Sequence, residues 1–152
     1  MPFLRVIDVN LNRLDESLKL IEDVVRFNIA NQRMLLRTRE LRRHFLGVKR
    51  SLPMNNIINA RQSGRDPGRV ASFDSRRVMD NNATIMANLG RAKQAARTIE
   101  EALRTVDIHL SRKVKEIRFQ IYDLEKDMIA ALAKRFNPYL HAIIDEKYAT
   151  SY

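Results

Sequence analysis

The stretch LRVIDVNLNRLDESLKLIEDVVRFN, residues 4–28, carries the pattern that decides the fold. Its apolar residues recur at alternating steps of three and four, at Leu4, Ile7, Leu11, Leu14, Leu18, Ile21 and Val25. This spacing places them on one face of an α-helix that runs to about Asn28. Pro2 fits the first helical turn, where its missing N–H costs no hydrogen bond. The sequence therefore predicts a long amphipathic helix that needs partners to cover its apolar face.

The same periodicity predicts three more helices further along the chain. The second is expected over residues 32–46, with Gly47 as its stop. The third is expected to follow a capping residue at Ser72 or Asp74. The fourth is expected to end at Asn137, because a following proline disfavours helical geometry.

No strand emerges from the pattern, since the one candidate, residues 56–60, is isolated. The predicted fold class is therefore all-α: an antiparallel helical bundle of two related helical hairpins with a long basic loop between them. The expected boundaries are a bundle domain at 1–135 with halves at about 4–47 and 74–135, a loop at 48–73, and a short terminal helix or tail at 136–152.

Composition narrows the class of protein. The chain has 152 residues, enough for one hydrophobic core, and no cysteine, which excludes disulfides, thiolate metal sites and cysteine nucleophiles. Charges interrupt every apolar stretch well before the roughly 18 residues that a membrane span needs. We expect a soluble cytoplasmic protein with no membrane partner. The three histidines lack the spacing of metal ligands.

The positive charge is concentrated in one segment. The formal net charge of the chain is +10, and residues 33–77 include twelve basic and only three acidic residues. Most of these basic residues are arginines, whose guanidinium groups can bind phosphate or carboxylate through two parallel hydrogen bonds. An anionic partner is one interpretation, and a solvated basic surface is the other.

Residues 48–72 are rich in Pro, Asn and Gly, which favour turns or extended chain. A connection of this length in a small protein is typical of a functional loop or of a disordered linker. Ile57 and Ile58 give it apolar side chains to bury, which a solvated linker would not need.

Two parts of the sequence also resemble each other. At an offset of 78, the segment 10–13 (NLNR) falls on 88–91 (NLGR) and 21–23 (IED) falls on 99–101 (IEE); at an offset of 76, 40–42 (ELR) falls on 116–118 (EIR). Matched polar residues are harder to explain by helical composition than matched apolar ones. The sequence therefore predicts an internal duplication.

The matched polar residues suggest a site. Asn10 and Arg13 lie three apart on one helix face beside the apolar stripe, and Asn88 and Arg91 repeat this placement. Two hairpins related by a pseudo-twofold axis would bring these residues towards a shared groove. The remaining matched residues, Arg42, Arg118, Glu22 and Glu100, would add guanidinium groups and carboxylates that balance them or hold a metal ion. The alternative is that these arginines and glutamates form ion pairs that fix the packing of the hairpins.

No phosphate-binding glycine loop, dinucleotide turn, zinc-protease motif or serine-hydrolase elbow is present. The order of other motifs resembles a known family. Residues 5–13 (RVIDVNLNR), the loop residues Ala60-Arg61 with Asp66, residues 87–89 (ANL), and 117–119 (IRF) before 122–126 (YDLEK) are similar to blocks of the small all-helical hydroxymethylpyrimidine phosphate kinase domain. In many bacteria that domain is fused N-terminal to thiamin phosphate synthase. The resemblance covers about residues 4–128.

The resemblance implies a phosphotransferase that moves the γ-phosphoryl group of ATP to hydroxymethylpyrimidine phosphate in thiamin biosynthesis, with ATP and Mg²⁺ as cofactors. Positive charge is what phosphoryl transfer chiefly needs. The expected roles are catalytic for Arg13, Arg91, Arg61 and Asp66, substrate and phosphate binding for Asn10, Asn88, Arg42 and Arg118, and metal or ring contacts for Glu22 and Glu100.

Two departures from the family pattern keep other functions open. Gln62 and Gln94 stand where the family usually has acids, and we expect a standalone domain with no synthase domain after it. One alternative is a catalytically altered relative that binds a nucleotide or a phosphorylated metabolite. Another is a basic helical protein that binds nucleic acid. The apolar residues of 139–144 are a candidate surface for a homodimer.

Overall fold

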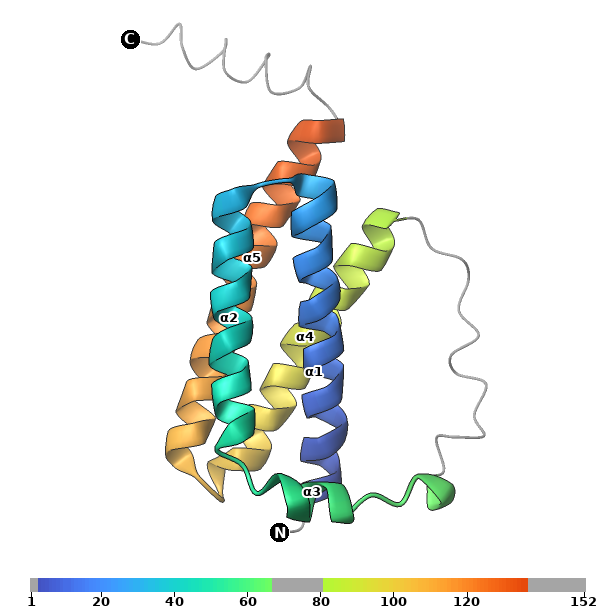
Figure 1. Cartoon of the computed structure of the whole chain (residues 1–152), viewed down its shortest axis with the longest axis vertical. Coiled ribbons are helices and arrows are strands. Elements are labelled where there is room, and N and C mark those ends of the chain that lie inside the picture. The colour runs from blue at the N-terminus through green and yellow to red at the C-terminus, as the bar shows by residue number, and fades with distance from the viewer. Residues whose placement is uncertain (1–2, 67–80, 137–152) are drawn as a thin grey trace, which may run out of the picture.

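The computed structural model describes residues 3–66 and 81–136, and the described regular structure is wholly helical (Figure 1). The elements in chain order are α1 (Leu4–Val24), η1 (Val25–Ile29), α2 (Gln32–Arg50), α3 (Met54–Asn59), η2 (Ser63–Arg65), α4 (Asn81–Arg104) and α5 (Ile108–Phe136). The all-α prediction is confirmed. The cap predicted at Ser72 or Asp74, the stop predicted at Asn137 and, apart from Phe136, the short helix or tail predicted at 136–152 lie outside the described residues.

The core is built from the predicted stripe. On α1 and at the start of η1, the residues from Ile7 to Val25 in that stripe are each at most 1% exposed. They pack in one continuous cluster with the inward residues of α2, α4 and α5. Burial of these aliphatic side chains, each contributing about 1.5–3 kcal/mol, is the main force that assembles the helices. Val106 follows the end of α4 at Arg104 and is exposed.

The helices are not packed equally. The α1–α4 and α4–α5 interfaces are the most extensive, whereas α2 makes fewer contacts with α1 and α5. Four buried residues of α4 are alanines (Ala92, Ala95, Ala96 and Ala102). Because helix separation depends on the side chains at the contact, short side chains on α4 favour close approach. The looser side of the bundle is therefore the one bordered by α2.

The turn between α1 and α2 is tight. The last part of the first helix widens into the single π turn η1, and Ala30 then adopts a left-handed conformation with φ of 55°. Asn31 caps α2, because its side chain accepts a hydrogen bond from the Met34 N–H at 2.9 Å. Together these features reverse the chain, and α2 runs back beside α1 (Figure 1).

Two predictions about residues 46–66 are wrong. Gly47 does not stop α2, which continues to Arg50, because no glycine in the described residues takes the left-handed conformation of a helix stop. The segment read as turn or extended chain contains the helix α3, which packs against α1 and buries Ile57. Burial of apolar side chains outweighed the turn preference of the neighbouring asparagines. No helix in the described residues combines the length and the apolar character needed to cross a membrane.

Candidate functional site

Each half of the bundle holds a buried glutamate between arginines. Glu22 of α1 is 8% exposed and accepts a hydrogen bond from Arg39 Nε at 3.1 Å and another from Arg42, both on α2. Glu100 of α4 is 2% exposed and accepts hydrogen bonds from Arg118 Nε of α5 at 2.8 Å and from Arg97 at 2.9 Å. Each glutamate thus joins its helix to the next long helix.

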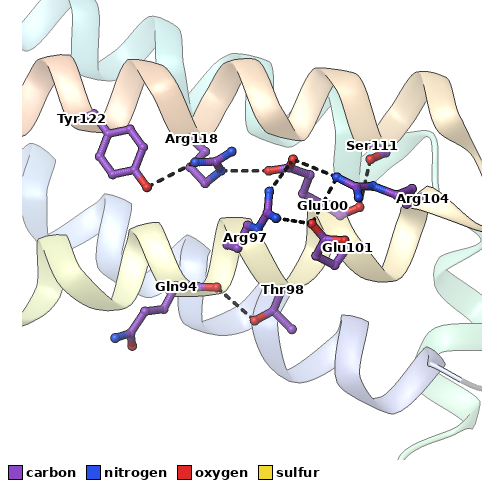
Figure 2. Close-up of polar contacts among 9 residues, drawn as sticks. All are labelled: Gln94, Arg97, Thr98, Glu100, Glu101, Arg104, Ser111, Arg118 and Tyr122. Atoms are coloured by element: carbon purple, nitrogen blue, oxygen red, sulfur yellow. Dashed lines mark hydrogen bonds and ion pairs between the residues drawn. The ribbon is translucent and has the colours of Figure 1, made fainter.

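Figure 2 shows the second of these clusters. Glu100 lies between Arg97 and Arg104 of its own helix and Arg118 of α5, and Arg118 also donates to the Tyr122 hydroxyl at 3.2 Å. Ser111 Oγ donates to the Glu100 backbone carbonyl at 2.9 Å, which adds a second link between the same two helices. The cluster is a tightly bonded bridge between α4 and α5.

These contacts favour the ionised state of the groups. Burial alone would raise the pKa of Glu22, but hydrogen bonds from Arg42 and Arg39 outweigh it and lower the pKa below its ordinary value. The pKa of Arg118 is raised because its hydrogen bond to Glu100 outweighs the effect of burial. The contacts therefore favour the charged form of Glu22 in one bridge and of Arg118 in the other.

Polar contacts recur at corresponding positions of the two halves. Five contacts of the first half reappear in the second half at the offsets of 78 and 76. Two lie within a helix: Asn10 with Val6 matches Asn88 with Thr84, and Lys19 with Asp23 matches Arg97 with Glu101. Three others follow in the order first half, then second half: Glu22 with Arg42 and Glu100 with Arg118; Asp15 with Lys49 and Lys93 with Glu125; and the capping pairs Asn31 with Met34 and Asp107 with Leu110. In the match of Asp15–Lys49 with Lys93–Glu125, the acid and the base have exchanged helices. An ion pair kept with its signs reversed is hard to explain by shared composition.

The two asparagines are held in matching ways. Each is 8% exposed, and each side-chain amide donates to the backbone carbonyl four residues earlier, at 2.8 Å. This bond fixes the orientation of the side chain and leaves its amide oxygen without a hydrogen-bond donor among the described residues. Asn10 and Asn88 can therefore accept a hydrogen bond from a ligand or from a neighbouring arginine.

Arg13 and Arg91 differ from the other predicted arginines. Both side chains are exposed, and neither has an ion pair or hydrogen bond within residues 3–66 and 81–136. Each lies three residues after one of the fixed asparagines, on the same side of its helix. Among the described residues these two guanidinium groups are thus unpaired, whereas Arg42 and Arg118 bind glutamates.

Arg61 joins the segment after α3 to the start of α1. Its Nε and Nη2 donate to the two carboxylate oxygens of Asp8 at 2.6 and 2.7 Å, and this contact raises the pKa of Arg61. Asp8 is 5% exposed. Asp66 follows η2 and closes the first described range. The structure therefore separates the predicted residues into three places: the glutamate bridges, the exposed Arg13 and Arg91, and the Asp8–Arg61 pair.

The carboxylates do not form a metal cage. Both oxygens of Glu22 accept hydrogen bonds from arginines, and Glu100 is surrounded by three. Among the described residues, no three His, Asp or Glu side chains gather as metal ligands would.

Sequence reasoning missed several partners. It did not assign Asp8, Asp15 or Ser111, although all three contact residues of another helix or segment. The signal for Asp8 was its position, since an acid within a predicted apolar flank needs a cation when it is buried. No sequence signal identifies which arginine, 53 residues away, supplies it.

Comparison with known proteins finds a matching family and several similar proteins. The family model described as the ThiD2 family matches residues 5–127. A thiamine-phosphate synthase of Parasynechococcus marenigrum (strain WH8102) is 33% identical over 130 residues, covering 84% of this chain and 36% of that protein. A thiamine-phosphate synthase of Synechococcus sp. (strain CC9605) is 34% identical over 124 residues, covering 80% of this chain and 34% of that protein.

The chain spans about one third of the length of these curated relatives. No solved structure matches it. The match of the family model covers most of the chain, including both glutamate bridges. The chain therefore belongs to the ThiD2 family.

Proposed function

We propose that this protein transfers the γ-phosphoryl group of ATP to hydroxymethylpyrimidine phosphate, forming the diphosphate used in thiamin biosynthesis. The family match and the similarity to thiamine-phosphate synthases support a role in this pathway. The resemblance of the sequence blocks to the helical kinase domain supports the specific reaction. The net charge of +10 suits a protein whose substrates all carry phosphate.

The observation that carries the proposal is the pair of free arginines. Arg13 and Arg91 occupy corresponding positions on α1 and α4 and have no protein partner within the described residues. Phosphoryl transfer is catalysed mainly by positioning and by positive charge at the transferring group. We assign Arg13 and Arg91 to bind phosphate oxygens, with Asn10 and Asn88 to orient them.

Arg42 and Arg118 have a different role in this proposal. Because each binds a buried glutamate, Arg42 links α2 to α1 and Arg118 links α5 to α4. We further propose that the bundle consists of two related hairpins, which the five repeated contacts support. Arg61 and Asp66 would act from the segment after α3, where the bond to Asp8 fixes the position of Arg61.

Mg²⁺ would neutralise charge on the nucleotide phosphates when bound with ATP. Glu22 and Glu100 do not serve as its ligands in this proposal, because arginines occupy them. An oxygen of the phosphate group of hydroxymethylpyrimidine phosphate attacks the γ-phosphorus of ATP, the bond from that phosphorus to the β–γ bridging oxygen breaks, and ADP leaves with that oxygen.

The test is an assay of purified protein with ATP, Mg²⁺ and hydroxymethylpyrimidine phosphate that follows formation of the diphosphate. Arg13→Gln and Arg91→Gln should each lower kcat about 100-fold or more, the usual effect of removing one group that stabilises transition-state charge. Arg112→Gln is the matched control, since Arg112 is also exposed and has no partner in the described residues. Equal activity of all three variants would contradict the assignment.

A catalytically altered relative is the second candidate, favoured by Gln62 and Gln94 in place of acids. Both glutamines are exposed, so an acid at either position would face solvent or a ligand. If the folded protein binds the substrates but yields no diphosphate, Gln62→Glu and Gln94→Glu should be tested for gain of activity. Gain of turnover would support the altered relative.

A further inference from the structure

A small cavity lies at one end of the interface between α1 and α4, which run in opposite directions (Figure 1). Its volume is about 310 Å³, at the lower end of the range of small-molecule sites, about 300–1,000 Å³. The cavity therefore suits one small ring rather than a nucleotide. The residues that line it are Phe3, Val6, Arg97, Thr98, Glu101 and Ala102.

The walls of this cavity are apolar or electrically compensated. Phe3 and Val6 present apolar side chains that are 47% and 39% exposed. The two charged lining residues, Arg97 and Glu101, form an ion pair with each other at 2.5 Å. An exposed aromatic ring favours packing against a second flat ring. The cavity thus selects an uncharged flat group, and nothing in its walls attracts a phosphate.

The polar groups at the cavity are hydrogen-bond acceptors. The Thr98 hydroxyl donates its hydrogen to the Gln94 backbone carbonyl at 3.0 Å, so its oxygen is left to accept. Asn10 lies one turn after Val6 on the same side of α1, and its amide nitrogen donates to the Val6 carbonyl at 2.8 Å. The Asn10 amide oxygen has no donor among the described residues. A ring that carries an amino group, which donates hydrogen bonds, therefore fits this end of the interface.

The cavity continues along α1 to the proposed phosphate site. Val6, Asn10 and Arg13 follow one another at steps of four and three residues on the same side of the helix, about 4.5–6 Å apart along its axis. Side chains on a helix lean towards its N-terminus, so Arg13 leans towards Asn10 and the cavity. A phosphate on a short arm of a ring in the cavity would therefore reach Arg13.

The internal repeat does not reproduce the apolar wall. At the offset of 78, Phe3 and Val6 correspond to Asn81 and Thr84, which are polar. The two ends of the α1–α4 interface thus share their asparagines and arginines but differ in the side chains beyond them. The end that contains Phe3 is the one suited to an apolar ring.

We propose that this cavity is the ring-binding part of the Arg13 site and that it selects aminopyrimidines. The ring packs against Phe3 and Val6, its amino group donates to the Asn10 amide oxygen, and its phosphate binds Arg13. Hydroxymethylpyrimidine phosphate has these groups: a ring amino group and a phosphate on a one-carbon arm. The inference rests on the proposed function, because it assigns the place of the acceptor substrate. Phe3, Val6 and Asn10 are then specificity-determining residues.

Two valines form a matched pair for the first test. Val6→Trp fills the cavity, whereas Val9→Trp adds the same side chain to the same helix at a position that is 41% exposed and does not line the cavity. Circular dichroism and thermal melting establish that both variants fold. A ligand-observed NMR titration then measures binding of hydroxymethylpyrimidine, the alcohol without phosphate. We expect Val6→Trp to weaken binding about tenfold or more and Val9→Trp to change it less than about twofold.

The second test measures the preference for the amino group. Its two probes are hydroxymethylpyrimidine and the analogue in which an oxo group replaces the ring amino group. Because an oxo group cannot donate to the Asn10 oxygen, we expect wild type to prefer the amino compound about tenfold or more. Asn10→Leu should abolish this preference. Asn88→Leu removes the corresponding amide at the other end of the interface and should keep the preference.

Three results overturn the proposal. Absence of binding by folded wild type, or equal weakening by the two tryptophan variants, overturns the location. Equal binding of the amino and oxo compounds by wild type overturns the selection of aminopyrimidines. A preference that survives in Asn10→Leu, or that Asn88→Leu abolishes equally, overturns the role of Asn10.

The outcome is separable from that of the proposed function, because binding of the alcohol needs neither ATP nor turnover. Selective binding that Val6→Trp weakens, in a protein that forms no diphosphate, supports the cavity and contradicts the kinase activity. Diphosphate formation with the same KM for hydroxymethylpyrimidine phosphate in wild type and Val6→Trp contradicts the cavity and leaves the kinase activity standing.

Discussion

Replacing Glu100 by glutamine tests whether the buried glutamate is a structural bridge. Glu100 is 2% exposed, and the Arg118 side chain that it binds is 11% exposed. The substitution keeps the size of the side chain but removes its charge, leaving a buried guanidinium without a counterion. Breaking a buried pair by removing one partner typically costs about 3–5 kcal/mol. Because three arginines surround Glu100 and a glutamine oxygen still accepts one hydrogen bond, we expect about 3 kcal/mol, near the lower end.

The neighbouring Glu101 supplies the control. It also pairs with Arg97 and Arg104, but its side chain is 41% exposed. An exposed pair contributes about 0–1 kcal/mol, so Glu101→Gln should change stability little. Equilibrium unfolding in urea measures both variants, and thermal melting should show a drop of about 6–12 °C for Glu100→Gln alone. Equal loss of stability in the two variants would refute the bridge and return Glu100 to the candidates for ligand binding.

Three further perturbations test other parts of the molecule. Gly47→Ala should raise the unfolding free energy by about 0.5–1 kcal/mol, because alanine restricts the unfolded chain and no neighbour obstructs its methyl group; a lower urea midpoint would contradict the space seen around Gly47. Asp107→Ala should lower the unfolding free energy by about 1 kcal/mol, since Asp107 Oδ1 accepts hydrogen bonds from the backbone N–H groups of His109 and Leu110 at 2.9 and 3.0 Å. An unchanged urea midpoint would show that this cap does not stabilise α5. Glu22, whose pKa is lowered in the folded state, contributes stability that is present above its unfolded pKa and lost as pH falls through the folded value. Urea unfolding of wild type and Glu22→Gln should therefore give a difference at pH 7 that shrinks below about pH 4.5, and a constant difference would be inconsistent with that pKa.

The helices were predictable because their cause is local. Apolar residues at steps of three and four from Ile7 to Val25 predict one structure, an amphipathic helix, and these residues are buried. The segment around α3 was not predictable in the same way. Its asparagines favour turns, and only the surface of α1 that Ile57 covers explains why a helix forms there.

The candidate site was predictable in its members but not in their pairing. The repeat identified Glu22, Glu100, Arg42 and Arg118, yet it left open whether they bind a ligand or each other. Long side chains on adjacent helices reach several partners, so the choice depends on helix separation, which the sequence does not state.

The kinase assignment is most directly tested by incubating purified protein with ATP, Mg²⁺ and hydroxymethylpyrimidine phosphate and following the pyrimidine diphosphate by chromatography. We expect ATP-dependent diphosphate formation that Arg13→Gln and Arg91→Gln abolish and Arg112→Gln preserves. Absence of product from folded wild-type protein, with an established kinase for the same step active in the same buffer, would contradict the assignment.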